Sequence, residues 1–250
     1  MIFKFSVAII TFNEEKNIER CIKSVIDLSD DIVVVDSGST DKTKEICERY
    51  KIRFYYNEFK DYGTQKSYAS NLTKYNFVLN IDADEVLSDD MRKSIISLKD
   101  FENHNIAFSF NRLNFFCGKP VRYCGWYPDR KIRLWNKNFG NWEGTVHEKL
   151  VFKTKPEILH LKGDLLHYTY NSYMEYFQRS IKYAYESAEK EFKTGKRAGL
   201  LKVYTSFCTK FFIIYIFKLG FLDGLTGFII SITTAYATFF KNLQLYTKQK

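Results

Sequence analysis

Three short apolar runs that each end in a polar turn restrict the fold of this chain most. The runs lie in the segments 6–10, 31–35 and 77–79, of which the first begins with Ser6 and the second with Asp31. After the first run, apolar residues recur at helical spacing between residues 18 and 25, and residues 43–50 form a second helical segment after the second run. Continuous apolar strands that alternate with helices imply a largely parallel sheet covered on both faces. The sequence therefore predicts an α/β fold.

The polar turns after these strands predict one shared site. Thr11, Asp36 and Asp82 all lie just past the end of an apolar run. Ligands of open parallel sheets collect beyond the carboxyl ends of the strands. Each of these residues on its own is equally typical of a helix cap or a solvated loop, but three in the expected places favour a common crevice.

Asp82 and Asp84 predict a metal ion in that crevice. In an extended segment, residues i and i+2 point to the same side, so both carboxylates can face one ligand. Two like charges so close together need a cation or hydrogen bonds to compensate them. Mg²⁺ and Mn²⁺ take oxygen ligands and commonly keep substrate phosphates in their shell. Acidic loops are abundant, so Asp82 and Asp84 alone are weak support for a metal site. The polar turns after the other two strands strengthen that prediction.

The segments around these turns resemble the family 2 glycosyltransferases of the GT-A fold. The resemblance rests on Ser-Val-Ala-Ile-Ile-Thr-Phe-Asn-Glu-Glu (6–15), Ile-Val-Val-Val-Asp-Ser-Gly-Ser-Thr-Asp (32–41) and Asn-Ile-Asp-Ala-Asp-Glu (80–85). Residues 126–135 and 142–148 resemble the branch that adds a sugar, often glucose, to the inner core of bacterial lipopolysaccharide. The resemblance implies a Rossmann-like, mostly parallel sheet flanked by helices.

The resemblance also implies roles on the donor side of the site. Asp84 is expected to be the principal ligand of Mg²⁺ or Mn²⁺, Asp82 to lie near the metal and the ribose, and His167 to complete the metal shell. A lone histidine is more often structural, and His147 is a further candidate. Binding of the nucleotide sugar is expected to involve Thr11, Phe12, Glu14, Asp36, Gln65, Lys66, Asp82, Arg130 and Arg133.

Inverting transfer requires a base that takes the proton of the acceptor hydroxyl, and a carboxylate in a partly closed site can supply it. By resemblance, Glu148 is the expected catalytic base and Asp129 the second choice. A structural salt bridge of Glu148 with Lys149, Arg130 or Arg133 is the alternative. One of the three tryptophans can also offer a flat face to a sugar ring, although tryptophan more commonly packs in a core.

Chain length and composition suit one domain with an appendage. We expect residues 1–170 to form the catalytic domain, with the nucleotide-sugar half at about 1–100 and the acceptor half at about 101–170, and residues 171–250 to form a helical region. The five cysteines include no Cys-x-x-Cys pair and are odd in number, which argues against a zinc site or a disulfide framework. No apolar leader precedes the first strand, so a cytoplasmic location is expected.

The C-terminal region is expected to associate with a membrane. Residues 200–221 are rich in aromatic side chains, but Lys202, Lys210 and Lys218 interrupt them, and no window reaches the roughly 20 apolar residues of a spanning helix. Interfacial helices, peripheral on the inner face of the bacterial cytoplasmic membrane, fit better. The formal charge of +9 suits an anionic membrane surface, and no nucleic-acid-binding motif is present. A hydrophobic subdomain core or a dimer contact is the alternative, and the oligomeric state stays open.

The resulting hypothesis is a metal-dependent inverting glycosyltransferase. It moves a hexose, glucose from UDP-glucose, onto a lipopolysaccharide inner core or a similar lipid-linked glycan acceptor. A polyprenyl-phosphate sugar synthase and a capsule or surface-glycan glycosyltransferase are the nearest enzymatic alternatives, because their donor halves would look the same. A nucleotidyltransferase fits less well, since a Gly-rich basic loop is replaced by Thr-Phe-Asn-Glu-Glu. A non-catalytic membrane adaptor with the same fold is the alternative outside enzymes.

Overall fold

The computed structural model describes residues 3–98, 105–144 and 148–249. The chain forms two compact units: Met1–Arg112 with Asp129–His167, and Leu113–Pro128 with Tyr168–Lys250. We refer to them as the catalytic unit and the helical unit. The sequence led us to expect one boundary near residue 170, whereas this division also places Leu113–Pro128 with the helices. Two of its three boundaries fall within long strands, Ile106–Phe116 and Glu157–Tyr170, and the third directly precedes the strand Asp129–Asn136, so no composition change along the chain marks them.

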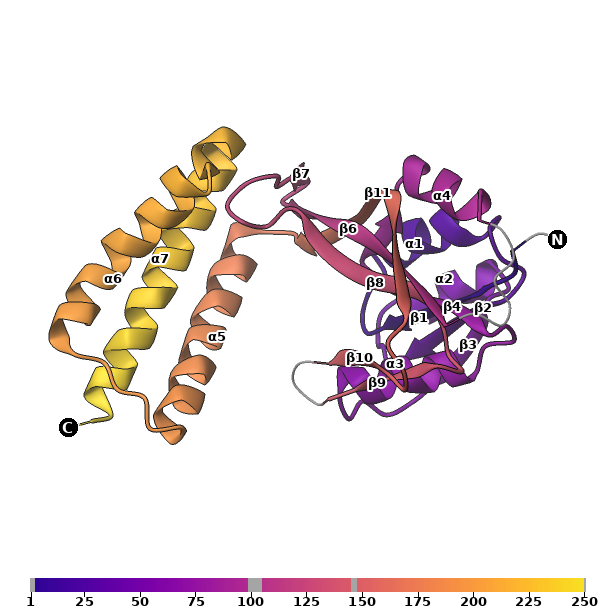
Figure 1. Ribbon diagram of the computed structural model, residues 1–250, viewed down its shortest axis with the longest axis horizontal. Coiled ribbons are helices and arrows are strands. Elements are labelled where there is room, and N and C mark those ends of the chain that lie inside the picture. The colour runs from indigo at the N-terminus through magenta and orange to yellow at the C-terminus, as the bar shows by residue number, and fades with distance from the viewer. Residues whose placement is uncertain (1–2, 99–104, 145–147, 250) are drawn as a thin grey trace. The chain divides into compact units, whose positions relative to one another are not determined.

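The first half of the catalytic unit contains four parallel strands in the order β3-β2-β1-β4 (Figure 1). They are β1 (Ser6–Thr11), β2 (Ile32–Asp36), β3 (Arg53–Tyr56) and β4 (Phe77–Asp82). Thr11 pairs with Asp36 and Ile10 pairs with Asp82 across neighbouring strands. The register therefore brings the polar ends of β1, β2 and β4 to the same edge, as the sequence predicted.

Helices cover both faces of these strands because the apolar side chains of the strands alternate between the faces. On one face, Val7 and Ile9 pack in one core with α1 (Ile18–Val25), α2 (Thr43–Arg49) and α4 (Asp89–Ile96). On the other face, Ala8 and Ile10 pack with Ala69 of α3 (Tyr62–Asn71). The strands are buried on both sides, which explains their uninterrupted apolar runs.

The second half of the sheet is mixed, with antiparallel and parallel neighbours. The order continues from β4 through β8 (Asp129–Asn136), β6 (Ile106–Phe116) and β11 (Glu157–Tyr170) to β5 (Glu85–Leu87), and β7 (Lys119–Pro120) pairs with β6. A separate hairpin joins β9 (Gly140–Glu143) to β10 (Lys149–Phe152). The predicted α/β class is confirmed. Strand β8 is antiparallel to β4 and β6, and β5 is antiparallel to β11. Strand β11 runs parallel to β6, because backbone hydrogen bonds join Glu157 to Asn105 at the start of both strands and Cys117 to Tyr170 at their ends.

The helical unit contains three long helices that lie side by side, with α7 between α5 and α6 (Figure 1). They are α5 (Tyr173–Lys193), α6 (Leu200–Phe212) and α7 (Gly224–Thr247). A π-helical segment, η1 (Ile213–Phe217), extends α6, and a 3₁₀ turn, η2 (Gly220–Asp223), leads into α7. Because of this extension, Leu200–Phe217 is an 18-residue helix that is long and apolar enough to cross a membrane, by length and composition alone. The sequence had predicted no such segment here.

Candidate functional site

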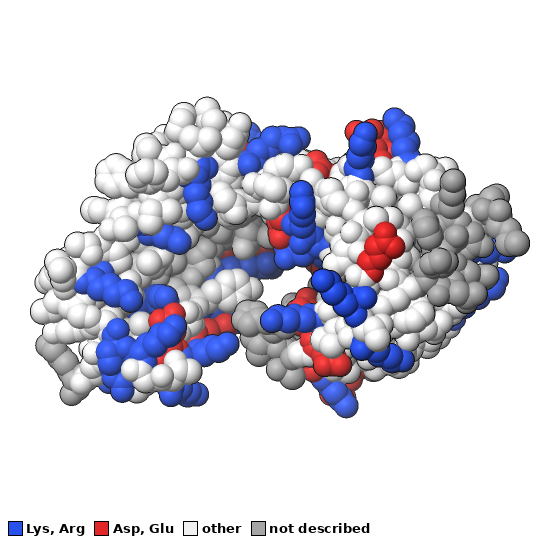
Figure 2. Space-filling model, in the orientation of Figure 1, with Lys and Arg blue, Asp and Glu red and all other residues white. Residues whose placement is uncertain are grey.

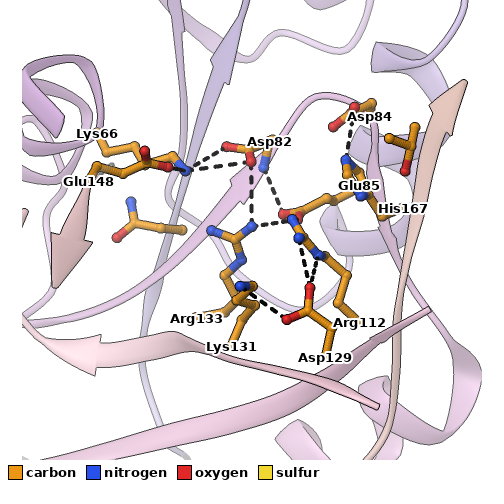
Figure 3. A network of polar contacts seen from close by, with 12 residues as sticks. Lys66, Asp82, Asp84, Glu85, Arg112, Asp129, Lys131, Arg133, Glu148 and His167 are labelled. Carbon is orange, nitrogen blue, oxygen red and sulfur yellow. Dashed lines mark hydrogen bonds and ion pairs between the residues drawn. The ribbon is translucent and has the colours of Figure 1, made fainter. Parts of the chain in front are cut away.

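A network of charged side chains surrounds Asp82 at the carboxyl end of β4 (Figure 3). Lys66 of α3 places its Nζ 3.2 Å from Asp82 Oδ1 and 3.1 Å from Glu148 Oε1. Arg133 Nη2 of β8 lies 3.4 Å from Asp82 Oδ2. Burial alone would raise the pKa of Asp82, but Lys66, Arg133 and His167 outweigh it and hold that pKa well below its usual range. Asp82 is therefore an ionised carboxylate held by two buried cations.

A buried ion pair between Glu85 and Arg133 supports this network. Both side chains are almost fully buried, and Arg133 Nη2 contacts Glu85 Oε1. The other carboxylate oxygen of Glu85 accepts a hydrogen bond of 3.0 Å from the backbone N–H of Asp82, so the same acid holds the end of β4. Arg133 is the extra residue of a β-bulge, because its neighbours Ile132 and Leu134 pair with consecutive residues of β6. Bulges of this kind redirect a side chain, here into the site.

Asp84 points away from Asp82 and toward His167. Strand β4 ends at Asp82, and Ala83 and Asp84 form the turn into β5, so the extended geometry expected from the sequence is absent here. Asp84 Oδ2 lies 3.2 Å from His167 Nε2. The pairing of β11 with β5, in which His167 is opposite Glu85, brings this histidine to the turn. Figure 3 shows Asp82 directed at Lys66 and Arg133, and Asp84 directed at His167.

The donors at this turn fit a divalent cation that also binds a diphosphate. Among the described residues, no group of three or more His, Cys, Asp or Glu side chains is arranged for a metal ion. Mg²⁺, however, is commonly held by one or two protein carboxylates together with substrate phosphates. Asp84 and His167 supply two adjacent donors, a carboxylate and an imidazole. His147, the other candidate, lies outside the described residues.

At the turns after β1 and β2, a side chain holds the backbone by hydrogen bonds, and the hydroxyl of Thr11 is left without a partner among the described residues. Asp36 Oδ2 accepts hydrogen bonds of 2.8 Å from the backbone N–H groups of Gly38 and Ser39, so this carboxylate shapes its own loop. Gly38 has a φ of 97°, a conformation that favours glycine. Thr11, opposite Asp36, is 4% exposed, and its Oγ1 has no hydrogen-bond partner within residues 3–98, 105–144 and 148–249. This buried hydroxyl is available to a ligand at the edge of the sheet.

The remaining predicted donor-side residues differ in their surroundings. Phe12 is 56% exposed, as a stacking residue in a site without ligand can be. Glu14 accepts a hydrogen bond of 2.5 Å from Asn17 Nδ2, which ties it to the start of α1. Gln65 is buried, and its Nε2 donates to Ser37 Oγ at 3.0 Å, so α3 is joined to the turn after β2. Their contacts with a nucleotide stay predictions.

Asp129 and Glu148 are not equivalent as candidate bases. Arg112 Nε and Nη2 lie 3.0 and 2.7 Å from Asp129 Oδ2, and Lys131 Nζ lies 3.0 Å from Oδ1. Burial alone would raise the pKa of Asp129, but these two cations hold it below its ordinary value, which weakens it as a base. Among the described residues, Glu148 forms its ion pair with Lys66, instead of with Lys149, Arg130 or Arg133 as the sequence suggested. Glu148 is therefore the better candidate.

Arg130 and the tryptophans lie elsewhere. Arg130 is exposed and alternates along β8 with Asp129 and Lys131, so it faces away from the network. Trp135 and Trp142 are buried, and the Nε1 groups of both donate to Asn80 Oδ1, at 2.9 and 3.0 Å. These two indoles are structural, so the expectation of a sugar platform does not apply to them. Trp126 packs against aromatic rings of the helical unit.

Sequence reasoning missed two members of the network, Glu85 and Arg112. Arg112 Nη1 lies 3.6 Å from Glu85 Oε1, so Glu85 is shared between Arg112 and Arg133. The signal for Glu85 was its place directly after the Asp-Ala-Asp turn in a strand, where an acid must find buried cations. Arg112 carried no comparable local signal, because its partners are distant in the sequence.

An α/β sheet with a charged site beyond the ends of its parallel strands defines the class of α/β enzymes that bind ligands at this edge. A family model described as Glycosyl transferase family 2 matches residues 6–156. An uncharacterized glycosyltransferase of Rickettsia bellii is 31% identical over 252 residues, which cover 97% of this chain and 86% of the relative. The chain belongs to glycosyl transferase family 2, and the predicted resemblance and enzyme class are confirmed.

Other similar proteins include a lipopolysaccharide enzyme. The lipopolysaccharide core biosynthesis glycosyltransferase LpsC of Rhizobium meliloti is 28% identical over 255 residues, which cover 97% of this chain and 92% of LpsC. Among solved structures, TarS of S. aureus matches with a TM-score of 0.45 and 16% identity, over 74% of this chain and 39% of TarS.

Proposed function

We propose that this protein is a metal-dependent inverting glycosyltransferase that transfers glucose from UDP-glucose to a lipid-linked glycan, with the lipopolysaccharide inner core as the acceptor class. The observation that supports the proposed donor is the set of polar groups at one edge of the sheet. Two buried cations face Asp82, an acid and an imidazole lie side by side at Asp84 and His167, and the Thr11 hydroxyl has no hydrogen-bond partner in the described parts of the chain. These groups match a diphosphate, a divalent cation and a nucleoside, respectively.

Asp84 and His167 are proposed to hold Mg²⁺ or Mn²⁺, which supplies charge neutralisation for the leaving diphosphate. Lys66 and Arg133 are proposed to face the same diphosphate, because guanidinium and ammonium groups suit phosphate oxygens. Their present partners, Asp82 and Glu148, show that both cations are already directed at one place. Thr11, Phe12, Asp36 and Gln65 are proposed to border the nucleoside, and Asp82 to border the ribose.

Glu148 is proposed to act as the catalytic base. The acceptor oxygen forms a bond to the anomeric carbon, the bond from that carbon to the phosphate oxygen breaks, and UDP leaves with the bonding electron pair. The carboxylate of Glu148 takes the proton of the acceptor hydroxyl. In the structure this carboxylate lies 3.1 Å from Lys66 Nζ. A donor diphosphate competes for Lys66, which would free Glu148 only once the donor is in place.

The acceptor half of the proposal rests on similarity and on the helical unit. LpsC is named for lipopolysaccharide core biosynthesis and matches nearly the whole length of this chain. A lipid-linked acceptor lies at a membrane surface, which agrees with the apolar helix Leu200–Phe217. On these grounds we propose that the protein works at the cytoplasmic face of the bacterial inner membrane.

Calorimetric titration with UDP, UDP-glucose, GDP and CMP tests the donor site, with Mn²⁺ and with EDTA in parallel. The proposal predicts binding of UDP and UDP-glucose only when Mn²⁺ is present. Tighter binding of GDP or CMP would change the assigned donor, and the absence of binding by any nucleotide would contradict the enzymatic assignment of these residues.

A further inference from the structure

All of the net charge of the protein belongs to the helical unit. Leu113–Pro128 and Tyr168–Lys250 together contain 14 Lys and Arg residues and 5 Asp and Glu residues, so their formal charge is +9. The catalytic unit contains 24 residues of each sign and is formally neutral. Figure 2 shows charged side chains gathered at one end of the helical unit, with few at the end formed by the turn between α6 and α7. The charge of this unit therefore suits an anionic partner.

The same unit exposes large apolar side chains in a regular pattern. On α7, Leu225, Phe228, Ile232 and Tyr236 are all exposed and follow one another at three- or four-residue steps, so they form one stripe. Leu225 is 66% exposed, far more than a core residue. No charged residue interrupts this stripe.

Neighbouring helices extend the stripe into a face. On α6 and η1, Tyr204, Cys208, Phe211 and Tyr215 recur at the same spacing, and the rings of Phe211 and Tyr215 lie 6.0 and 5.8 Å from the ring of Phe228. On α5, the ring of Phe177 stacks on Tyr236 at 5.8 Å. We call these nine residues the apolar face. Tyrosine is common in such surfaces because its ring is apolar and its hydroxyl stays wet.

The opposite side of α7 is already covered by residues of the same unit. Cys124 packs with Ile214 and Ile230 in a buried cluster, and Asp223 accepts hydrogen bonds from the backbone N–H groups of Arg122 and Tyr123. Leu113–Pro128 therefore supplies a protein partner for that side. Within the part of the chain that the structure describes, the apolar face has no equivalent cover, since its α7 members remain exposed.

We propose that the apolar face docks the protein on an anionic lipid bilayer, with α5, α6 and α7 lying in the plane of the membrane. The inference deepens the membrane part of the proposed function and does not depend on the donor. A second copy of the chain is the less suitable occupant, because the helical unit of that copy carries the same +9 charge and repels the first. Anionic headgroups attract that charge.

An in-plane arrangement also fits the neighbours of Leu200–Phe217 better than a span. Helix α7 is bound along its length to α5, which carries several charged residues, and ion pairs join Lys241 to Glu191 at 2.9 Å and Lys248 to Glu189 at 2.6 Å. Lys202 and Lys210 lie within the apolar segment itself, off the stripe formed by Tyr204 and Cys208. Taking such groups into the bilayer core is unfavourable, whereas in-plane docking leaves them at the headgroups.

Cys208 provides the test, because it belongs to the apolar face and lies at the middle of Leu200–Phe217. It is exposed, whereas Cys21, Cys47 and Cys124 are buried and Cys117 is half-buried. An environment-sensitive fluorophore attached to Cys208, on a Cys117→Ser background, reports how deep this point enters a vesicle. Quenchers at known depths in vesicles of equal phosphatidylglycerol and phosphatidylcholine supply the measurement, without donor or acceptor.

In-plane docking predicts a depth of about 5–10 Å below the headgroups, and binding that weakens with salt and with pure phosphatidylcholine. A depth at the bilayer centre, about 15 Å for a hydrocarbon core of about 30 Å, would overturn the proposal in favour of a span. An unchanged fluorophore spectrum would also overturn it. Sedimentation without lipid completes the test, because a stable dimer that protects Cys208 from labelling would identify a second copy as the occupant.

Glutamate substitutions on highly exposed members of the face locate the contact. Tyr204→Glu and Leu225→Glu should each lower vesicle partitioning about ten- to a hundredfold, since each removes the burial of a large side chain. Ile96→Glu is the matched control, because Ile96 is 68% exposed on α4 of the catalytic unit. Equal loss for the control, or no loss for the two variants, would overturn the assignment. Circular dichroism checks folding, and UDP affinity measured separately shows whether the proposed function stands or fails on its own.

Discussion

The two units of this protein differ in which groups they bury and which they expose. The catalytic unit is formally neutral and buries charged groups, with Glu85, Arg133 and Lys66 almost fully covered. The helical unit carries the whole +9 charge and exposes apolar side chains such as Phe217, which is 80% exposed. Buried charges are unfavourable unless they are paired, and exposed apolar groups are unfavourable unless they are covered. The buried charges of the catalytic unit therefore indicate a charged ligand there, and the exposed apolar side chains of the helical unit indicate an apolar surface as its partner.

Glu148→Gln is expected to have the largest effect, and it acts on the catalytic unit alone. Loss of a catalytic base should lower turnover by about 10²–10⁴-fold, while UDP binding stays intact because the amide keeps the size of the side chain. Glu143→Gln is the control, since Glu143 is an exposed acid of the same hairpin. A transfer assay with isolated core glycan measures both, and near-normal turnover of Glu148→Gln would remove Glu148 from this role.

Arg133→Met is expected to destabilise the catalytic unit far more than loss of a surface charge destabilises the helical unit. It leaves Glu85 buried with its principal cation missing, and breaking a buried pair in this way destabilises a fold by about 3–5 kcal/mol. Lys248→Met in the helical unit removes an ion pair on the surface, and we expect no measurable change. Urea unfolding provides both free energies. Equal effects of the two variants would break the distinction, and the double variant Glu85→Gln/Arg133→Met should recover part of the loss.

Asp31 gives the catalytic unit a pH-dependent contribution. Asp31 is 4% exposed and accepts hydrogen bonds of 2.6 Å from Ser6 Oγ, the Lys74 backbone N–H and Arg53 Nη1. Burial alone would raise the pKa of Asp31, but these donors hold it below its ordinary value. Because the folded pKa is depressed, the stabilisation is present above the unfolded pKa of about 3.9 and is lost as the pH falls through the folded pKa.

Asp31→Asn should therefore destabilise the protein by about 1–3 kcal/mol at neutral pH, since an amide places a donor where three donors converge. The difference between wild type and variant should shrink below about pH 4. Unfolding measured at several pH values tests this, and a difference that stays constant down to low pH would contradict the role given to the carboxylate.

Ser172→Ala is expected to have the smallest effect and belongs to the helical unit. Ser172 Oγ accepts a hydrogen bond of 3.1 Å from the Glu175 backbone N–H, and Glu175 Oε2 accepts one of 3.0 Å from the Asn171 backbone N–H, so α5 begins with a reciprocal cap. Loss of such a cap costs about 1 kcal/mol. Thermal unfolding followed by circular dichroism measures it. A loss as large as that of Arg133→Met would mean that the helical unit depends on local polar contacts as much as the catalytic unit does.

The parallel half of the fold was predictable because its signals are local. Apolar runs, the turns after them and the helical spacing of residues 18–25 lie within short windows of sequence, and the structure has β1, α1 and β2 where they were expected. The second half of the sheet depends on pairing between distant segments, such as β11 with β5, for which short windows carry little information. The same reason explains why Leu113–Pro128 was not expected to pack with the helices.

The sequence predicted which residues lie near the candidate site, but not how they contact one another. Asp82, Asp84, Lys66, Arg133, Glu148 and His167 were all expected near the site from the resemblance. The structure joins Asp82, Lys66, Arg133 and Glu148 in one network and places Asp84 and His167 as a separate pair at the turn after β4. The direction of the Asp84 side chain was not predicted, because the chain turns at Ala83 where we had expected an extended segment. The contact of Lys66 with Glu148 joins residues 82 positions apart, and the bulge that directs Arg133 inward depends on the pairing of β8 with β6.

Calorimetry of UDP with wild type and Asp84→Asn, each with Mn²⁺ and with EDTA, measures whether Asp84 holds the cation of the donor site. If Asp84 and His167 hold the cation that binds the donor diphosphate, wild type binds UDP with Mn²⁺ only, and the variant binds UDP weakly whether or not Mn²⁺ is present. Equal Mn²⁺-dependent affinity for UDP in both proteins would remove Asp84 from the metal shell and contradict this account of the site.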